Sequence, residues 1–287
     1  MQSLNDEYNG QLQLAIEMFT NQYHRPFFGQ LIASQLDIDR LDYLQRDCFF
    51  TGVSEGTIGA DRIIKMLDLV DDSLVVEEKG IYSIENFLNA RRLMYWQVYL
   101  HKTSISAEQI LILILKRARH LIENGYPLFS GQAFSRFLKE PISLHQLKSN
   151  PSLLKDFASL DDIDIWGAIK VWQYESDKVI MLLCKSLLDR KLFKIKLYNS
   201  SSEIPNTTEL LHQIQKKYDF TPEEASFLLS SGTITNAAYI AKGKLINILT
   251  KKGKIKDVAQ ASDLPNIKAI SKIVKKYYVC HPKNITL

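Results

Sequence analysis

The sequence predicts a mainly α-helical protein with a small appended α+β unit at its C-terminal end. Apolar residues recur every three or four positions over most of the chain, which is the period of an amphipathic helix. Beyond the serine-rich stretch at residues 199–202, two helical segments are followed by short β-prone ones. We therefore divide the chain into a helical core (1–128), a helical extension (129–198) and a small α+β unit (199–287).

The N-terminal half is expected to form a series of helices connected by short loops. Apolar periodicity predicts helices over residues 7–20, 37–50, 60–67, 85–101 and 106–123. Ser106 has Gln109 three positions after it, the spacing of a capping box, so Ser106 is the expected N-cap of the last of these helices. The glycine-bounded loop 51–56 lacks the Gly-Lys-Ser/Thr ending of a phosphate-binding loop, and we interpret it as a connector.

Strands are expected in two places. Residues 73–78 and 81–83 flank Lys79-Gly80, and this arrangement predicts a hairpin with its turn at the glycine. The C-terminal unit is expected to have two helices and three strands, over residues 207–218, 222–229, 233–240, 244–250 and 274–280.

Composition excludes several classes of protein. Hydrophobic residues make up 46% of the chain and charged residues 24%, which is ordinary for a globular protein, and the net charge of +4 is too small to indicate a partner. The cysteines, at positions 48, 184 and 280, are few and far apart, as in proteins of a reducing compartment. No apolar run approaches the ~20 residues that span a bilayer. We therefore expect a cytoplasmic protein with no membrane partner.

The most informative segment is residues 37–47, which combines a helical apolar stripe with an unusual set of charges. Along a second face, positions spaced by four hold two carboxylates and a phenol: Asp39, Tyr43 and Asp47. Two guanidinium groups lie beside that face, on Arg40 and Arg46. Such a face can bind a cation and a phosphorylated sugar. It can equally be a solvated face, on which these arginines pair with Asp37, Asp42 or Asp47.

The stretch Ser34-Gln-Leu-Asp-Ile-Asp-Arg-Leu-Asp-Tyr43, with Arg46-Asp47, resembles the late metal-binding helix of the HD-domain phosphohydrolases. Within them it is most similar to the deoxynucleoside-triphosphate triphosphohydrolases, the dGTPase-like and SAM-and-HD-domain enzymes. Arg91 with Tyr99-Leu-His-Lys102 resembles the family's phosphate- and sugar-contacting helix, and Asp189-Arg-Lys-Leu-Phe-Lys194 resembles a third element. The blocks follow the family order from about residue 30 to residue 195.

The resemblance implies the C-terminal part of an HD-domain helical core and the hydrolysis of a deoxynucleoside triphosphate to nucleoside and tripolyphosphate. It implies a divalent metal ion, of which Asp39 would be the last ligand. It further implies a substrate-binding set, in which arginines contact phosphates, Asp47 accepts from a sugar hydroxyl and Tyr99 packs against the deoxyribose. This set is Arg40, Tyr43, Asp47, Arg91 and Tyr99. Leu100 departs from the polar residue common at its position, so the preferred base stays open.

The histidine and the His-Asp pair that complete the family's metal site have no counterpart. No histidine of this chain is followed by aspartate. One carboxylate cannot hold a divalent ion, because such sites take about three or four protein ligands. We therefore expect a truncated chain that lacks a complete catalytic set, does not hold the metal alone and is inactive alone. A degenerate homologue kept for binding is the alternative.

Two alternative functions come from other features. Residues 242–283 contain eleven lysines against two acidic residues, with Tyr277 and Tyr278 near the end. A basic stripe with aromatic residues can bind nucleic acid, although lysines at sheet edges also prevent unwanted strand pairing. The family resemblance also implies a homo-oligomer, because enzymes of this branch assemble through their helical bodies.

Overall fold

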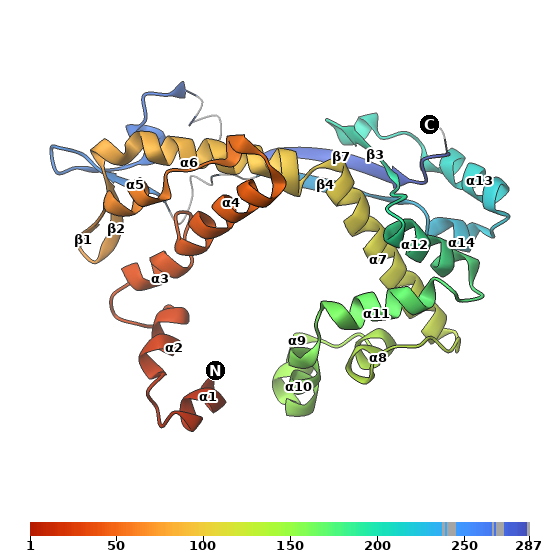
Figure 1. The fold of residues 1–287 in the computed structure, drawn as a ribbon. Coiled ribbons are helices and arrows are strands. Elements are labelled where there is room, and N and C mark those ends of the chain that lie inside the picture. The colour runs from red at the N-terminus through yellow and green to blue at the C-terminus, as the bar shows by residue number, and fades with distance from the viewer. Residues whose placement is uncertain (237–238, 240–244, 266, 268–272, 286–287) are drawn as a thin grey trace. The chain divides into compact units, whose positions relative to one another are not determined.

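Helices make up most of the chain, as predicted, and two small sheets complete it (Figure 1). The computed structural model describes residues 1–236, 239, 245–265, 267 and 273–285. The chain divides into unit 1, residues 1–101 and 235–275, and unit 2, residues 102–234 and 276–287. Each unit thus joins segments that are distant in sequence. The predicted division into 1–128, 129–198 and 199–287 stays a prediction.

Unit 1 consists of short helices and a four-stranded sheet. Its helical elements are α1 (Gln2–Glu7), α2 (Gln13–Phe19), α3 (Phe27–Ile32), α4 (Ile38–Thr51), η1 (Ser54–Gly56), α5 (Ala60–Lys65), η2 (Glu78–Gly80), α6 (Ile81–Met94), η3 (Tyr95–Tyr99) and α15 (Val258–Ala261). Its strands are β1 (Leu67–Val70), β2 (Ser73–Glu77), β5 (Asn247–Leu249) and β6 (Ile255–Asp257), in the order β1-β2-β5-β6. Strands β2 and β5 are parallel and the other pairs antiparallel.

Unit 2 is built on the long helix α7 (Lys102–Glu123), which packs against α12 (Lys178–Leu188). The remaining helical elements are α8 (Gln132–Lys139), α9 (Leu144–Ser149), α10 (Pro151–Ser159), α11 (Asp162–Trp172), η4 (Ser201–Glu203), α13 (Thr207–Tyr218) and α14 (Pro222–Ser226). The second sheet has the order β3-β7-β4, with β3 (Lys194–Tyr198), β7 (Val274–His281) and β4 (Ser230–Asn236). Strands β3 and β7 pair antiparallel, with Ile195 opposite Cys280.

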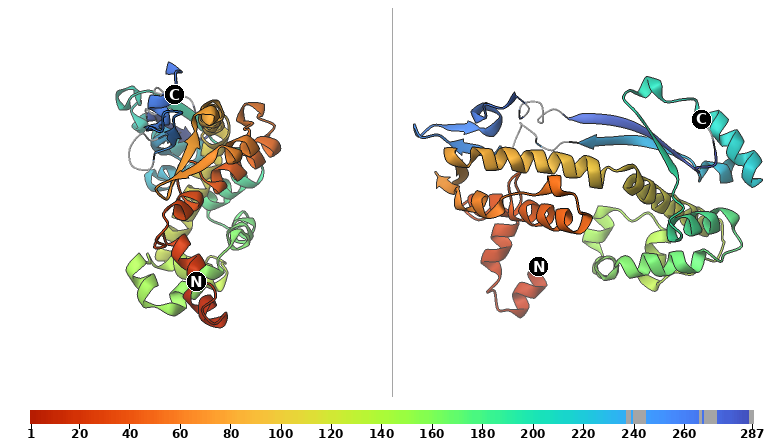
Figure 2. Two further views of the ribbon diagram at one scale, coloured as in Figure 1. Left: turned by 90° about the vertical axis from the view of Figure 1, so that its left-hand side faces the viewer. Right: turned by 45° about the horizontal axis from the view of Figure 1, so that its top comes forward.

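Helix α4 forms where the motif segment predicts it. The carboxylate of Asp37 caps its N-terminus by accepting from the backbone N–H of Arg40 at 2.8 Å. Gly52 ends it in the left-handed conformation, with φ of 70°. Leu41 and Leu44 face inward, and α4 lies alongside α6 in both views (Figures 1 and 2). Burial of this apolar stripe therefore fixes which face of α4 stays available for chemistry.

The core of unit 1 joins α4, α6 and the sheet. Its fully buried members include Leu44, Ile84, Phe87, Leu88 and Met94. Gly56 of η1 is packed closely against α6, since a Cβ atom there would lie 2.5 Å from the Met94 sulfur. These contacts place the C-terminal half of α6 against α4, which brings together the two blocks of the family resemblance.

The predicted hairpin at Lys79-Gly80 is wrong. The hairpin is β1–β2, and its turn is Asp71-Asp72, where both residues have positive φ, 49° and 56°. Two left-handed residues in a two-residue turn match the twist of antiparallel strands. Gly80 instead belongs to η2, where a Cβ would lie 2.8 Å from both Met66 and Val76. Glycine at position 80 is therefore needed for close packing and not for a turn.

A further prediction of secondary structure is wrong, and another lies partly outside the described residues. Helix α7 begins at Lys102, so Ser106 is not its N-cap; Ser106 is buried and donates to the carbonyl of Phe193 at 2.8 Å. Strand β4 covers part of the strand predicted at 233–240, but residues 237, 238 and 240 lie outside the described residues, as does residue 244 of the next one. Within the described part of the chain, no helix has the length and apolar character that crossing a bilayer requires.

Candidate functional site

The side chains on the motif face of α4 differ in their exposure to solvent. Asp39 is exposed, whereas Tyr43, one turn later, and Asp47, two turns later, are half-buried. The spacing of four residues puts all three on one side of the helix. The structure adds that the first of the three is exposed and the other two are half-buried.

The opposing residues come from α6 and its continuation η3. The Tyr99 hydroxyl donates to Oδ2 of Asp47 at 2.6 Å, across 52 positions of sequence. The Tyr99 ring also meets the Tyr43 ring edge to face, with centroids 6.2 Å apart. Such a charge-assisted hydrogen bond holds the phenol in one orientation. The structure thus joins Tyr43, Asp47 and Tyr99 in one cluster.

Arg91 lies near Tyr43 of this cluster and is a buried cation with unpaired donors. Its exposed fraction is 6%, yet Nε and Nη1 have no hydrogen-bond partner among the residues that the structure describes. Buried charges are ordinarily paired, since an unpaired one costs several kcal/mol, about 3–5 by the measured cost of breaking a buried pair. A guanidinium in this state is ready to accept an anionic ligand.

The two tyrosines of the cluster stay protonated. Burial raises the pKa of Tyr43 above its ordinary value, although the nearby positive charge of Arg91 opposes this. Burial raises the pKa of Tyr99 further, and its hydrogen bond to the Asp47 carboxylate acts in the same direction. Both phenols therefore remain hydrogen-bond donors over the physiological pH range.

The arginines of the motif helix pair within that helix, as one of the two interpretations allowed. Arg40 donates through Nη1 to Asp37, whose side chain is almost fully buried, and Arg46 pairs with Asp42 at the surface. The Nε of Arg40 is buried without an acceptor among the described residues. Arg40 thus keeps one donor for a ligand, and its role in phosphate binding stays a prediction.

The predicted metal ligand stands apart from the cluster. The exposed carboxylate of Asp39 has no hydrogen-bond or ion-pair partner among the described residues. Those residues also contain no group of three or more histidine, cysteine, aspartate or glutamate side chains placed to hold a metal ion. The side chains described here therefore do not fit a divalent ion by themselves. The role of Asp39 stays a prediction.

Two features of this region were not predicted from the sequence. One is the N-cap role of Asp37, whose pairing with Arg40 was among the predicted alternatives; the other is Tyr95. Tyr95 lies between Arg91 and Tyr99 and contacts both: the Arg91 guanidinium carbon is 5.8 Å from its ring centroid, and the Tyr99 ring is 5.3 Å away. The spacing of four residues on either side of Tyr95 is the signal that could have identified it.

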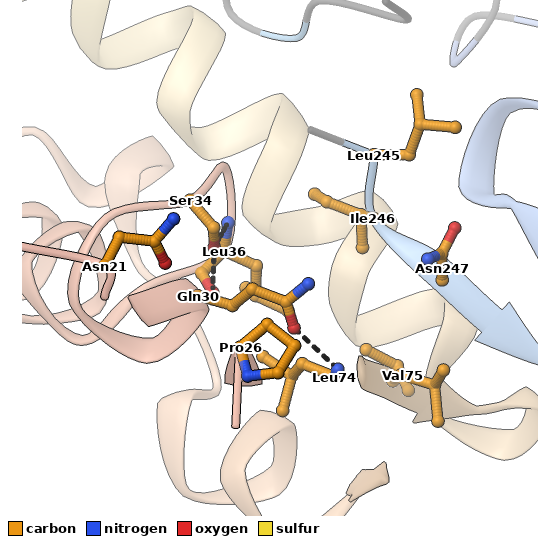
Figure 3. A pocket seen from close by; sticks show the side chains of 11 residues that line it. Asn21, Pro26, Gln30, Ser34, Leu36, Leu74, Val75, Leu245, Ile246 and Asn247 are labelled. Carbon is orange, nitrogen blue, oxygen red and sulfur yellow. Dashed lines mark hydrogen bonds between the residues drawn. The ribbon is translucent and has the colours of Figure 1, made fainter. Parts of the chain in front are cut away.

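Two pockets of unit 1 lie outside this cluster. One, of about 340 Å³, is lined by Asn21, Pro26, Gln30, Ser34, Leu36, Leu74, Val75, Val76, Leu245, Ile246 and Asn247 (Figure 3). None of these lining residues is charged, and Gln30 accepts from the backbone N–H of Leu74 at 2.7 Å. The other, of about 400 Å³, is largely apolar and lies between α4 and α5. Neither pocket includes a predicted substrate-binding residue, and the neutral one does not suit a triphosphate.

Comparison with known proteins agrees with the mainly helical fold and with an HD-type phosphohydrolase. Residues 58–125 match the HD associated region family. The structure of a phosphohydrolase from Bacteroides thetaiotaomicron is 48% identical, with a TM-score of 0.91, over 98% of this chain and 70% of that one. The uncharacterised protein YwfO of Bacillus subtilis is 32% identical over 86% of this chain and 55% of its own length. This chain thus spans about half the length of the curated relatives it matches.

A more distant relative is named after a deoxynucleoside triphosphate triphosphohydrolase. The Dictyostelium discoideum homologue of the deoxynucleoside triphosphate triphosphohydrolase SAMHD1 is 28% identical over 36% of this chain and 21% of its own length.

Proposed function

The chain belongs to the HD-type phosphohydrolases, and on this basis we propose that it provides the phosphate- and sugar-binding side of a site for deoxynucleoside triphosphates. The observation that carries the proposal is Arg91, a buried guanidinium with two unpaired donors beside three tyrosines. Phosphate and carboxylate oxygens are both good acceptors for the N–H donors of a guanidinium. The distant similarity to a triphosphohydrolase supports the nucleotide class.

The other residues of the cluster suit the sugar. Asp47 uses one carboxylate oxygen to accept from Tyr99, which leaves the other to accept from a hydroxyl of the deoxyribose. The same hydrogen bond holds the Tyr99 ring in place, so a 2′-hydroxyl group on the sugar would clash with this ring. A deoxyribose lacks this group and fits.

The chemical step needs more than these residues. A metal ion in complete members of the family would supply an activated water and offset charge on phosphate oxygens. Asp39 alone cannot hold such an ion. We therefore propose that the chain as given binds nucleotide without hydrolysing it.

The test is to measure binding and turnover separately on the 287-residue chain. Calorimetry with dGTP, GTP and tripolyphosphate, in EDTA, is expected to show binding of dGTP and tripolyphosphate, with GTP weaker by about tenfold or more, because a clash costs over ~1.4 kcal/mol. When dGTP is incubated with the chain and Mn²⁺ or Mg²⁺, no release of tripolyphosphate from dGTP is expected. Absence of nucleotide binding would refute the binding role, and release of tripolyphosphate would refute inactivity.

Nucleic-acid binding is the second candidate function, favoured by the hairpin of β5 and β6. Lys251, Lys252, Lys254 and Lys256 are all exposed there, whereas Lys242, Lys244, Lys268 and Lys272 lie outside the described residues. For a single-stranded oligonucleotide, affinity should fall with rising salt by about 0.7 logarithmic units per phosphate contact and per decade of salt. Replacing the four hairpin lysines by glutamine should flatten this slope. Binding that is absent or insensitive to salt would remove this candidate.

A further inference from the structure

We propose that Tyr95, the first residue of η3, is a positioning residue that holds the Arg91 guanidinium and the Tyr99 ring for a phosphorylated ligand. The inference rests on the proposed function and extends it to a residue outside the predicted binding set. Tyr95 is half-buried and contacts both partners, with the Arg91 guanidinium carbon 5.8 Å from its ring centroid and the Tyr99 ring 5.3 Å away at 80°. A guanidinium over the face of an aromatic ring and two aromatic rings packed edge to face are both favourable geometries.

The backbone explains how one side chain contacts both. In an α-helix, a residue and the one four positions later are offset by about 40° around the axis, so positions 91, 95 and 99 would spiral by about 80°. Here the N–H of Leu100 donates to the carbonyl of Tyr95 at 2.7 Å, the five-residue bond of a π-helical turn. The wider turn rotates less per residue and so returns Tyr99 toward the line of Arg91 and Tyr95. Such turns inside helices are frequent at functional sites.

A ring face is the contact that suits an arginine reserved for a ligand. A carboxylate in the same place would occupy the N–H donors, whereas an aromatic face attracts the cation without accepting them. Nε and Nη1 of Arg91 have no acceptor among the described residues, and Asp47 accepts from Tyr99. Tyr95 therefore orients Arg91 and leaves its donors free.

The experiment measures tripolyphosphate affinity by calorimetry in the Tyr95→Leu and Tyr95→Phe variants. Loss of the ring is expected to weaken binding by about 5- to 30-fold, the range of cation–π energies for partly to fully desolvated pairs. The phenylalanine variant keeps the ring and should bind within about twofold of the parent. The control is Tyr82→Leu in the preceding helix α6, where the tyrosine is 68% exposed and no change is expected. If the leucine variant does not fold, Tyr95→Gln replaces it.

A double-mutant cycle with Arg91→Gln separates this inference from the proposed function. If Tyr95 acts through Arg91, Tyr95→Leu should cost no further affinity once Arg91 is gone. If Arg91→Gln alone leaves tripolyphosphate affinity unchanged, the proposed function fails. If Arg91→Gln weakens binding but Tyr95→Leu does not, or if the two losses simply multiply, the positioning role of Tyr95 is overturned and the proposed function stands.

Discussion

Replacing Arg91 by glutamine is expected to weaken the binding of tripolyphosphate and dGTP by about 10- to 150-fold, because hydrogen bonds to charged groups contribute about 1.5–3 kcal/mol. The same change should leave the ligand-free chain as stable as before or more stable. Arg91 is buried with unpaired donors, so its removal relieves an uncompensated charge. A loss of affinity without a loss in the free energy of unfolding is the signature of a residue kept for a ligand. Calorimetry and denaturant unfolding measure the two quantities.

The matched control for Arg91 is its neighbour. Arg92→Gln removes the same charge from the same helix, and Arg92 is less buried. It should change tripolyphosphate affinity by less than about threefold, the order of a screened surface charge. Arg91→Lys should fall between, since it keeps the charge and loses the fork. If the Arg91 and Arg92 variants lost affinity equally, the effect would come from net charge alone, and a specific binding site would be contradicted.

The second large effect is expected in unit 2, where Asp177→Ala should lower the free energy of unfolding by about 3–5 kcal/mol. Asp177 accepts from Nε and Nη2 of Arg117, at 3.2 and 2.6 Å, and Arg117 is 5% exposed. Its Oδ1 also accepts from the backbone N–H of Ile180 at 2.8 Å and caps α12. The alanine variant therefore leaves a buried cation unpaired and removes a cap. Chemical denaturation at pH 7 measures the loss.

Two comparisons test this explanation. Asp189→Ala removes the partner of Lys191 in a surface pair with side chains 49% and 78% exposed, and should cost less than about 1 kcal/mol. The double variant Arg117→Met with Asp177→Asn should recover most of the loss, because a buried pair replaced as a whole is often close to neutral. A loss no larger than that of Asp189→Ala would show that Arg117 finds another partner or solvent.

The helical fold was predictable because its signals are local. Apolar spacing was enough to predict α4, and α13 (Thr207–Tyr218) was predicted with its observed bounds. The hairpin was misplaced because glycine is common in turns. At position 80, however, glycine is required because Met66 and Val76 approach its backbone closely. The role of Ser106 was mispredicted for a similar reason. Its hydroxyl donates a hydrogen bond to a carbonyl 87 positions away, which no local sequence pattern predicts.

The sequence by itself determined the mainly helical class, the residue types along α4 and the similarity to HD-type phosphohydrolases, since these depend on neighbours within a turn or two of helix. Only the tertiary structure decided that Tyr99 bonds Asp47, that Arg91 is buried with free donors and that Asp39 faces outward. Each of these depends on how α6 and η3 pack against α4. The physical reason is that burial and pairing of a charge arise from segments distant in sequence, whose approach local patterns do not specify.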